Sequence, residues 1–230
     1  MVMILGKRNF AAVVCIFSVL TLFNLEAEIE TLLPQQIEIP TVKETCAFVN
    51  LSTECPNIIL DIRYATSNNF LGFALYSQPS CYLHRDAAAA LVEVQQELSL
   101  MNLGIKVFDG YRPLSVQQAM WDAIQDERYV SNPAINKGRH TRGTAVDVTL
   151  VDRDGNELEM PTSFDDFSDK AHSDCTGVTD AANKNRALLK DVMEKHHFQQ
   201  LSTEWWHFDF EGWFDDVKFP SQNAAFDELE

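Results

Sequence analysis

The stretch GRHTRGTAVDVTL, residues 138–150, places His140 seven residues ahead of Asp147, which stands in an apolar run. Residues 144–150 alternate as in a β-strand, with the valines and Leu150 on one face and Asp147 on the other. A buried carboxylate is costly in free energy unless it is paired or bound to a metal. The stretch therefore predicts a strand whose carboxylate has a partner elsewhere in the chain.

The segments around this strand carry both helical and strand-like patterns. Apolar residues recur every three or four positions from Arg85 to Asn102, which predicts an amphipathic helix. Two further helices are expected, over 115–126 and 179–196. Other strands are expected at NIILDIRYAT (57–66), IKVFD (105–109) and TEWWHFDF (203–210). This order predicts an α+β fold with a small antiparallel sheet and flanking helices.

The N-terminus has the pattern of a secretory signal. Lys7 and Arg8 precede the apolar run FAAVVCIFSVLTLF, which is short for a membrane span, and Ala27 is a small residue suited to cleavage. We therefore expect removal of residues 1–27 on export to the periplasm or the exterior. An uncleaved anchor, touching the membrane only through this segment, is the alternative. The mature chain would comprise an extended lead-in (28–57), one domain (58–215) and an acidic tail (216–230).

The net charge argues against two classes of partner, and the cysteine count limits the possible disulfides and zinc sites. The net charge of −16 argues against nucleic acid or anionic membranes as the main ligand. Four cysteines remain after cleavage, and an oxidising compartment would permit two disulfides. None of the four has the CxxC spacing of a cysteine-based zinc site. These cysteines are Cys46, Cys55, Cys81 and Cys175.

Histidines and carboxylates gather in two strand-like segments. His140 accompanies Asp147, and His207 follows Glu204 in EWWHFDF (204–210). Two histidines and one carboxylate, with an open fourth position, make up a catalytic zinc site. Glu204 then has the place of a general base that is not itself a ligand. Residues three apart on a strand face opposite sides, so this arrangement requires a bend or bulge near Trp205.

Arg112 supplies a third part in FDGYRP (108–113). It follows a predicted strand and precedes a proline that fixes the turn. A guanidinium does not lose its proton and is a good donor to an oxyanion or a carboxylate. A surface ion pair is the alternative interpretation of an isolated arginine.

Three motifs occur in this order and at these distances: DGYRP (109–113), HTRGTAVDVTL (140–150) and EWWHF (204–208). Together they resemble the motifs of the D-alanyl-D-alanine dipeptidases of the vancomycin-resistance type. These are zinc peptidases related to D,D-carboxypeptidases and, in fold, to the Hedgehog signalling domain. The similarity covers about 58–210 and includes the segments 64–76, 160–172 and 185–193. It implies a Hedgehog-like D,D-peptidase fold and zinc-dependent hydrolysis of D-Ala-D-Ala.

The resemblance also implies roles for individual residues. One zinc ion per chain would be bound by His140, Asp147 and His207. Glu204 would be the catalytic base, and Arg112 would stabilise the tetrahedral intermediate.

The substrate contacts are less closely defined. Tyr64, Asp165 and Asp166 are candidates, and either aspartate is able to meet the ammonium group of a small dipeptide. Two positions depart from the family pattern. Gly138 stands where the family often has a serine that could hold the substrate, and His197 stands where a glycine commonly precedes Phe198.

Two other functions remain open. A D,D-carboxypeptidase would trim longer peptidoglycan stems, whereas closure of the long polar segment 151–178 over the site would favour a small substrate. A zinc-binding module without catalysis is the second alternative. Glu204 and Arg112 speak against it, because zinc binding alone needs neither.

Overall fold

The computed structural model describes residues 47–230, so the expected signal segment (1–27), most of the lead-in and Cys46 lie outside the described part of the chain. The first elements are β1 (Phe48–Asn50), α2 (Leu51–Glu54), β2 (Ile59–Leu60), β3 (Tyr82–His84) and α3 (Arg85–Leu100). The middle of the chain forms β4 (Leu103–Asp109), α4 (Leu114–Ala123), α5 (Pro133–Asn136) and β5 (Ala145–Asp152). The last elements are α6 (Asp180–Lys195), β6 (Phe198–Gln200) and β7 (His207–Phe210).

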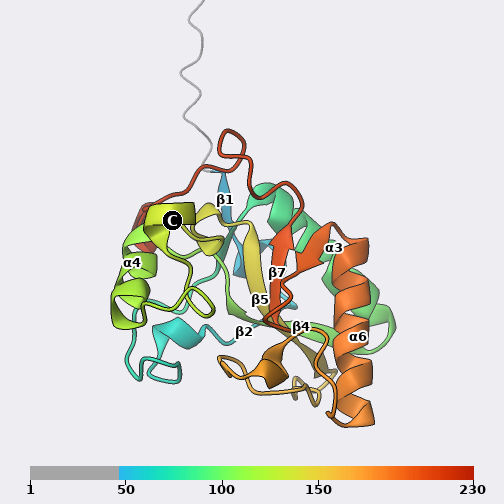
Figure 1. Ribbon diagram of the computed structural model, residues 1–230. Helices are drawn as coiled ribbons and strands as arrows, with labels where there is room; N and C mark the ends of the chain where they lie inside the picture. The colour runs from blue at the N-terminus through green and yellow to red at the C-terminus, as the bar shows by residue number, and fades with distance from the viewer. Residues whose placement is uncertain (1–46) are drawn as a thin grey trace, which may run out of the picture. The chain divides into compact units, whose positions relative to one another are not determined.

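A five-stranded sheet with the order β2-β4-β5-β7-β6 organises the domain (Figure 1). The central strand β5 pairs antiparallel with β4 and β7, and β6 pairs antiparallel with β7. Only the short edge strand β2 runs parallel to its neighbour β4. Strands β1 and β3 form a separate antiparallel pair. The predicted α+β fold with a small, mainly antiparallel sheet is confirmed.

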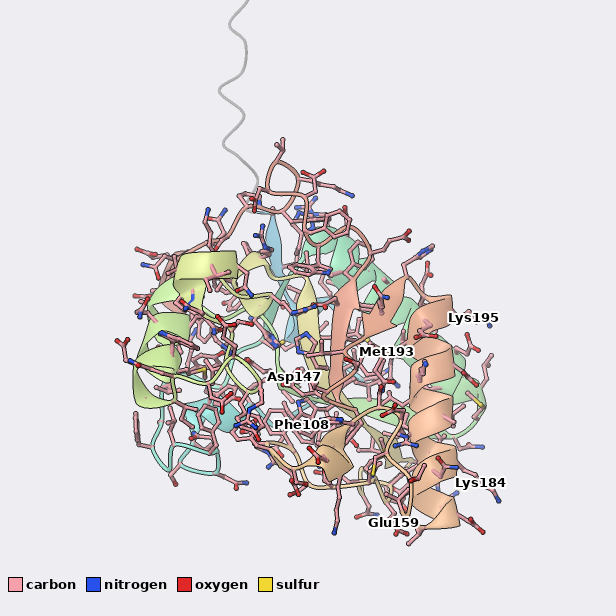
Figure 2. All side chains as sticks on the ribbon, viewed as in Figure 1. Phe108, Asp147, Glu159, Lys184, Met193 and Lys195 are labelled. Carbon is pink, nitrogen blue, oxygen red and sulfur yellow. The ribbon has the colours of Figure 1, made fainter. Side chains whose placement is uncertain are left out.

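Helices α3 and α6 lie together along one side of the sheet, and α4 lies on the other side of β5 (Figure 1). The predicted apolar side of α3 is buried through Leu91, Val94 and Leu98. The helix ends at Leu100, short of the predicted end at Asn102, and Met101 just beyond it is 42% exposed. On α6, Met193 is buried and faces the sheet, whereas Lys184 and Lys195 point away from it (Figure 2). Helices α3 and α6 therefore cover the valine face of β5 and leave its other face for the site.

Two predicted strands are shorter than expected. The segment 57–66 pairs with β4 only at Ile59–Leu60, and Tyr64 lies in a 3₁₀ turn (Arg63–Ala65). In the segment 203–210 the strand begins at His207, since a turn occupies the preceding residues. The lead-in is also less extended than expected, because its described part forms β1 and α2.

The acidic C-terminal segment packs against the domain. Phe219 and Phe226 are buried, which a free tail would not allow. The Tyr111 hydroxyl donates a hydrogen bond to the Ala224 carbonyl at 3.0 Å, and the Gln222 amide donates to the Thr141 carbonyl at 2.8 Å. The segment 216–230 therefore supports the loop that carries His140.

Cys55, Cys81 and Cys175 are free thiols, so no disulfide joins any two of the described cysteines. The two disulfides considered from the cysteine count are therefore not formed in this part of the chain. Burial raises the pKa of the Cys81 thiol far above its ordinary value, which keeps it protonated. Between residues 47 and 230, no helix is long and apolar enough to cross a membrane.

Candidate functional site

Two neighbouring strands bring Asp147 and His207 together. They are direct partners in the β5–β7 pairing, so their side chains share one face of the sheet. His207 Nδ1 lies 3.0 Å from Asp147 Oδ1. His140 enters from a 3₁₀ turn (His140–Arg142) before β5, and its Nε2 lies 3.2 Å from His207 Nδ1 and 3.4 Å from Asp147 Oδ2. All three residues are buried, and Figure 2 shows Asp147 in the interior of the domain.

Hydrogen bonds on the outer side of each imidazole fix which nitrogen faces inward. His140 Nδ1 donates to the Gly110 carbonyl at 2.8 Å, which leaves the lone pair of a neutral ring on Nε2. His207 Nε2 donates to Asp209 Oδ1 at 3.1 Å, which leaves the lone pair on Nδ1. Two nitrogen lone pairs and the Asp147 carboxylate thus converge on one point. This donor set fits a divalent metal ion such as zinc, and such outer hydrogen bonds orient metal-binding histidines.

The electrostatic potential at the point where these three donor atoms converge is negative. Burial lowers the pKa of His207, but the carboxylates of Asp209 and Asp147 outweigh burial and raise this pKa to about 10. The same carboxylates favour a metal cation, which would displace the proton from the ring. The cluster is therefore suited to binding a cation.

Glu204 lies beside the cluster without joining it. Its Oε2 is 3.9 Å from His207 Nδ1. The turn before β7 supplies the expected bend near Trp205, so that Glu204 and His207 line the same cavity. Burial raises the pKa of the Glu204 carboxyl above its ordinary value, toward the range in which a general base is effective at neutral pH.

Arg112 is a buried cation in the same cavity. Its Nε and Nη2 donate to Asp109 Oδ2 at 3.2 and 2.7 Å, and its Nη1 donates to Gln117 Oε1 at 2.9 Å. The guanidinium also lies over the Tyr64 ring, 5.1 Å from its centroid. Its pairing with Asp109 is internal, which excludes the alternative of a surface ion pair.

Two of the three candidate substrate contacts line the cavity, and the third does not. Tyr64 and Asp165 line the cavity, and the Tyr64 hydroxyl donates to Asp165 Oδ1 at 3.1 Å. Asp165 Oδ2 is buried and has no hydrogen-bond partner among the described residues. Burial, reinforced by Asp147, raises the pKa of Asp165 to about 7. Asp166 instead accepts from the Ser168 amide at 2.9 Å and does not line the cavity.

The cavity has a volume of about 230 Å³. The segment 151–178 contributes only Asp165 and Phe167 to its lining, while a larger share comes from 127–136. Phe167 stacks on Tyr129 with ring centroids 4.5 Å apart and contacts Phe70 at 5.2 Å. The wall expected from 151–178 is therefore shared among three loops.

Both departures from the family pattern occur where the backbone is left-handed. Gly138 has φ of +84°, and a Cβ there would lie 3.1 Å from the Gln117 side chain. His197 has φ of +68° just after α6, a conformation that glycine adopts more readily. The absence of a serine hydroxyl at position 138 thus has a local steric reason.

Sequence reasoning missed three residues that hold the site in place. Asp209 had a usable signal, because it stands two residues after His207 and therefore on the same strand face. Asp109 lies within the DGYRP motif and was not given a role. Gln117 had no local signal, because its contact with Arg112 depends on how α4 follows the turn.

The matching family model and the sequence relatives agree on one family. The family model described as D-ala-D-ala dipeptidase (Peptidase M15) matches residues 44–223. The D-alanyl-D-alanine dipeptidase of Escherichia coli (strain K12) is 36% identical over 73% of this chain and 86% of its own length. That of Enterococcus faecalis (strain ATCC 700802 / V583) is 32% identical over 64% of this chain and 83% of its own length. The solved vancomycin-resistance D,D-dipeptidase VanXYg, in complex with a D-Ala-D-Ala phosphinate analogue, is 24% identical over 58% of this chain and 52% of its own, with a TM-score of 0.37.

Proposed function

We propose, from the premise that this chain belongs to the D-alanyl-D-alanine dipeptidase family of M15 peptidases, that it hydrolyses the free dipeptide D-Ala-D-Ala with one bound zinc ion. His140, Asp147 and His207 would hold the zinc. The convergence of their three donor atoms at one point of a small cavity carries the proposal. The relatives, named as dipeptidases of this kind, supply the substrate.

The cavity suggests how the dipeptide is oriented. Its ammonium group would meet Asp165, whose Oδ2 is buried and lacks a partner among the described residues. Its peptide carbonyl would lie between the metal cluster and Arg112. A volume of about 230 Å³ is below the roughly 300–1,000 Å³ of sites for drug-sized ligands, which favours a substrate this small.

The chemistry follows from these positions. Zinc, when bound, would supply Lewis-acid polarisation and a water of lowered pKa. Glu204 accepts a proton from the attacking water and returns it to the leaving amine. Arg112 presents a fixed positive charge where negative charge develops on the carbonyl oxygen. Asp109 and Gln117 hold that charge in place through their hydrogen bonds to the guanidinium.

Two alternative functions fit this site less well. A D,D-carboxypeptidase needs room for the rest of a stem peptide, which the small cavity disfavours. A non-catalytic zinc module would need neither Glu204 nor the buried Arg112.

We further propose export of the mature protein to the periplasm or the exterior, on the pattern of residues 1–27.

The test is an assay of the purified mature protein on D-Ala-D-Ala, L-Ala-L-Ala and a pentapeptide ending in D-Ala-D-Ala. We expect turnover of the first alone, lost with a chelator and restored by zinc. Comparable turnover of the pentapeptide would favour the carboxypeptidase. A zinc-loaded protein that cleaves none of the three would favour the non-catalytic module.

A further inference from the structure

Gln117 lies on α4 and connects two parts of the site that are distant in sequence. Its side chain is buried, with 1% of the residue exposed. Its Oε1 accepts from Arg112 Nη1 at 2.9 Å, and its Nε2 donates to the Ser131 carbonyl at 2.8 Å. An arginine only donates and a carbonyl only accepts, so these two partners define the orientation of the amide.

The hydrogen bonds from Arg112 to Asp109 would by themselves leave the guanidinium free to rotate about one point. Both of its hydrogen bonds to Asp109 end on the same oxygen, Oδ2. The second oxygen, Oδ1, accepts from the Tyr76 hydroxyl at 2.7 Å, which fixes the carboxylate. A guanidinium held at a single oxygen can still pivot about it. The bond from Nη1 to Gln117 is a second point of attachment and stops this pivot.

Gly138 provides the space that this arrangement needs. A Cβ at position 138 would lie 3.1 Å from Cγ, Cδ and Oε1 of Gln117. Such separations are tighter than ordinary van der Waals contact, so a larger residue would displace the amide from its position between Arg112 and Ser131. The glycine therefore permits the observed position of Gln117.

We propose that Gln117 is a positioning residue, which fixes the orientation of the Arg112 guanidinium and couples it to the cavity wall at Ser131. The proposal rests on the role proposed above for Arg112. Without Gln117 the guanidinium would keep its charge and its bond to Asp109, but it would lose its alignment on the developing oxyanion. The loss should therefore appear in the chemical step more than in substrate binding.

The test begins with Gln117→Met, which preserves length and apolar packing and removes both hydrogen bonds. We expect kcat per bound zinc to fall roughly tenfold, with KM within about twofold of the parent enzyme. Gln118→Met is the matched control, because Gln118 is the next residue on α4 and is exposed, and among residues 47–230 its side chain hydrogen-bonds only to Asp122. It should leave both constants unchanged.

A second measurement separates positioning from a general structural role. If Gln117 acts through Arg112, adding Gln117→Met to Arg112→Lys should lower kcat little further, because the two effects share one interaction. Independent, multiplying losses would overturn the proposal, as would an unchanged kcat in Gln117→Met. If Gln117→Met does not fold, Gln117→Asn withdraws the amide by one methylene and should show the same loss of kcat.

The outcome also distinguishes this inference from the proposed function. If Arg112→Lys leaves kcat unchanged, the role of Arg112 is wrong and the role of Gln117 falls with it. If Arg112→Lys lowers kcat while Gln117→Met does not, only the inference about Gln117 is wrong.

Discussion

Asp209 accepts a hydrogen bond from Nε2 of His207 at 3.1 Å, on the side of the imidazole that faces away from Asp147. The other carboxylate oxygen of Asp209 is paired with Arg139. The bond to Asp209 selects the tautomer of His207 that directs Nδ1 toward Asp147 and His140. One carboxylate outside the cluster thus determines what the cluster can bind.

Asp209→Asn should weaken metal binding while the fold is retained. The amide removes the charge, and its NH₂ group is able to bond Nε2 and stabilise the wrong tautomer. We expect the zinc dissociation constant, measured by competition with a chelator, to rise about 10–100-fold. Glu211→Gln, at an exposed carboxylate just after β7, is the control and should have no effect. Equal affinities in the two variants would contradict the role of Asp209.

Substitutions within the site should separate ligands from the base. His207→Ala or Asp147→Ala should lose both bound zinc and activity. Glu204→Gln should keep one zinc per chain while kcat falls by roughly 10²–10⁴-fold, the contribution of a general base. Metal analysis of the purified variants checks this. An empty site in Glu204→Gln would make Glu204 a ligand and the proposed mechanism wrong.

Asp165 should give the enzyme a pH-dependent KM. Burial raises its pKa to about 7, so the carboxyl is neutral below that pH and ionised above it. Only the ionised form attracts the substrate's ammonium group, so KM should rise as the pH falls below about 7. Asp165→Asn should raise KM and abolish this dependence, while Asp166→Asn should leave the profile of the parent enzyme. A pH-dependent KM that persists in Asp165→Asn would assign it to another group.

The sequence was sufficient for the parts of the site that depend on local pattern. Alternation over 144–150 indicated a strand with Asp147 on the face opposite the valines, and β5 has this form. The need to place Glu204 beside His207 indicated a bend, and the turn before β7 provides it. Both inferences depend only on the geometry of a strand and the cost of a buried carboxylate.

Other parts depend on tertiary contacts that no local pattern encodes. The direct pairing of Asp147 with His207 is set by the register of β5 against β7. The charge of the C-terminal segment gave no sign that Phe219 and Phe226 are buried. The contact between Gln117 and Gly138 joins α4 to a distant loop, and therefore the steric reason for a glycine could not be foreseen.

His197→Gly should stabilise the protein. The left-handed backbone at His197 costs a non-glycine residue about 1–2 kcal/mol, and the exposed pair with Glu211 contributes little in return. We expect the Tm to rise by about 2–4 °C with kcat unchanged. His196→Gly is the contrasting variant, because His196 has negative φ and pairs with Glu93 and Glu97. It should lower the Tm, and a lower Tm in His197→Gly would contradict the assigned strain.

Gly138→Ser tests whether a hydroxyl at this position helps or harms. The sequence alone suggested that the missing serine weakens substrate binding, so that restoring it would lower KM, provided that the backbone there does not need positive φ. The observed φ of +84° and the nearness of Gln117 predict the opposite. The serine would strain the backbone by about 1–2 kcal/mol and push Gln117 away from its bond with Arg112.

Gly177→Ser is the matched control for Gly138→Ser. Gly177 has φ of +81°, and no atom lies within 4 Å of the place a Cβ would take, so it carries the same backbone penalty without the collision. Both variants should therefore lower the Tm, measured by thermal unfolding, and Gly138→Ser should lower it by at least as much as Gly177→Ser. Only Gly138→Ser should also lower kcat, and its KM should not improve. A lower KM with kcat preserved would restore the sequence-based hypothesis, since the hydroxyl would then contact the substrate despite the strain.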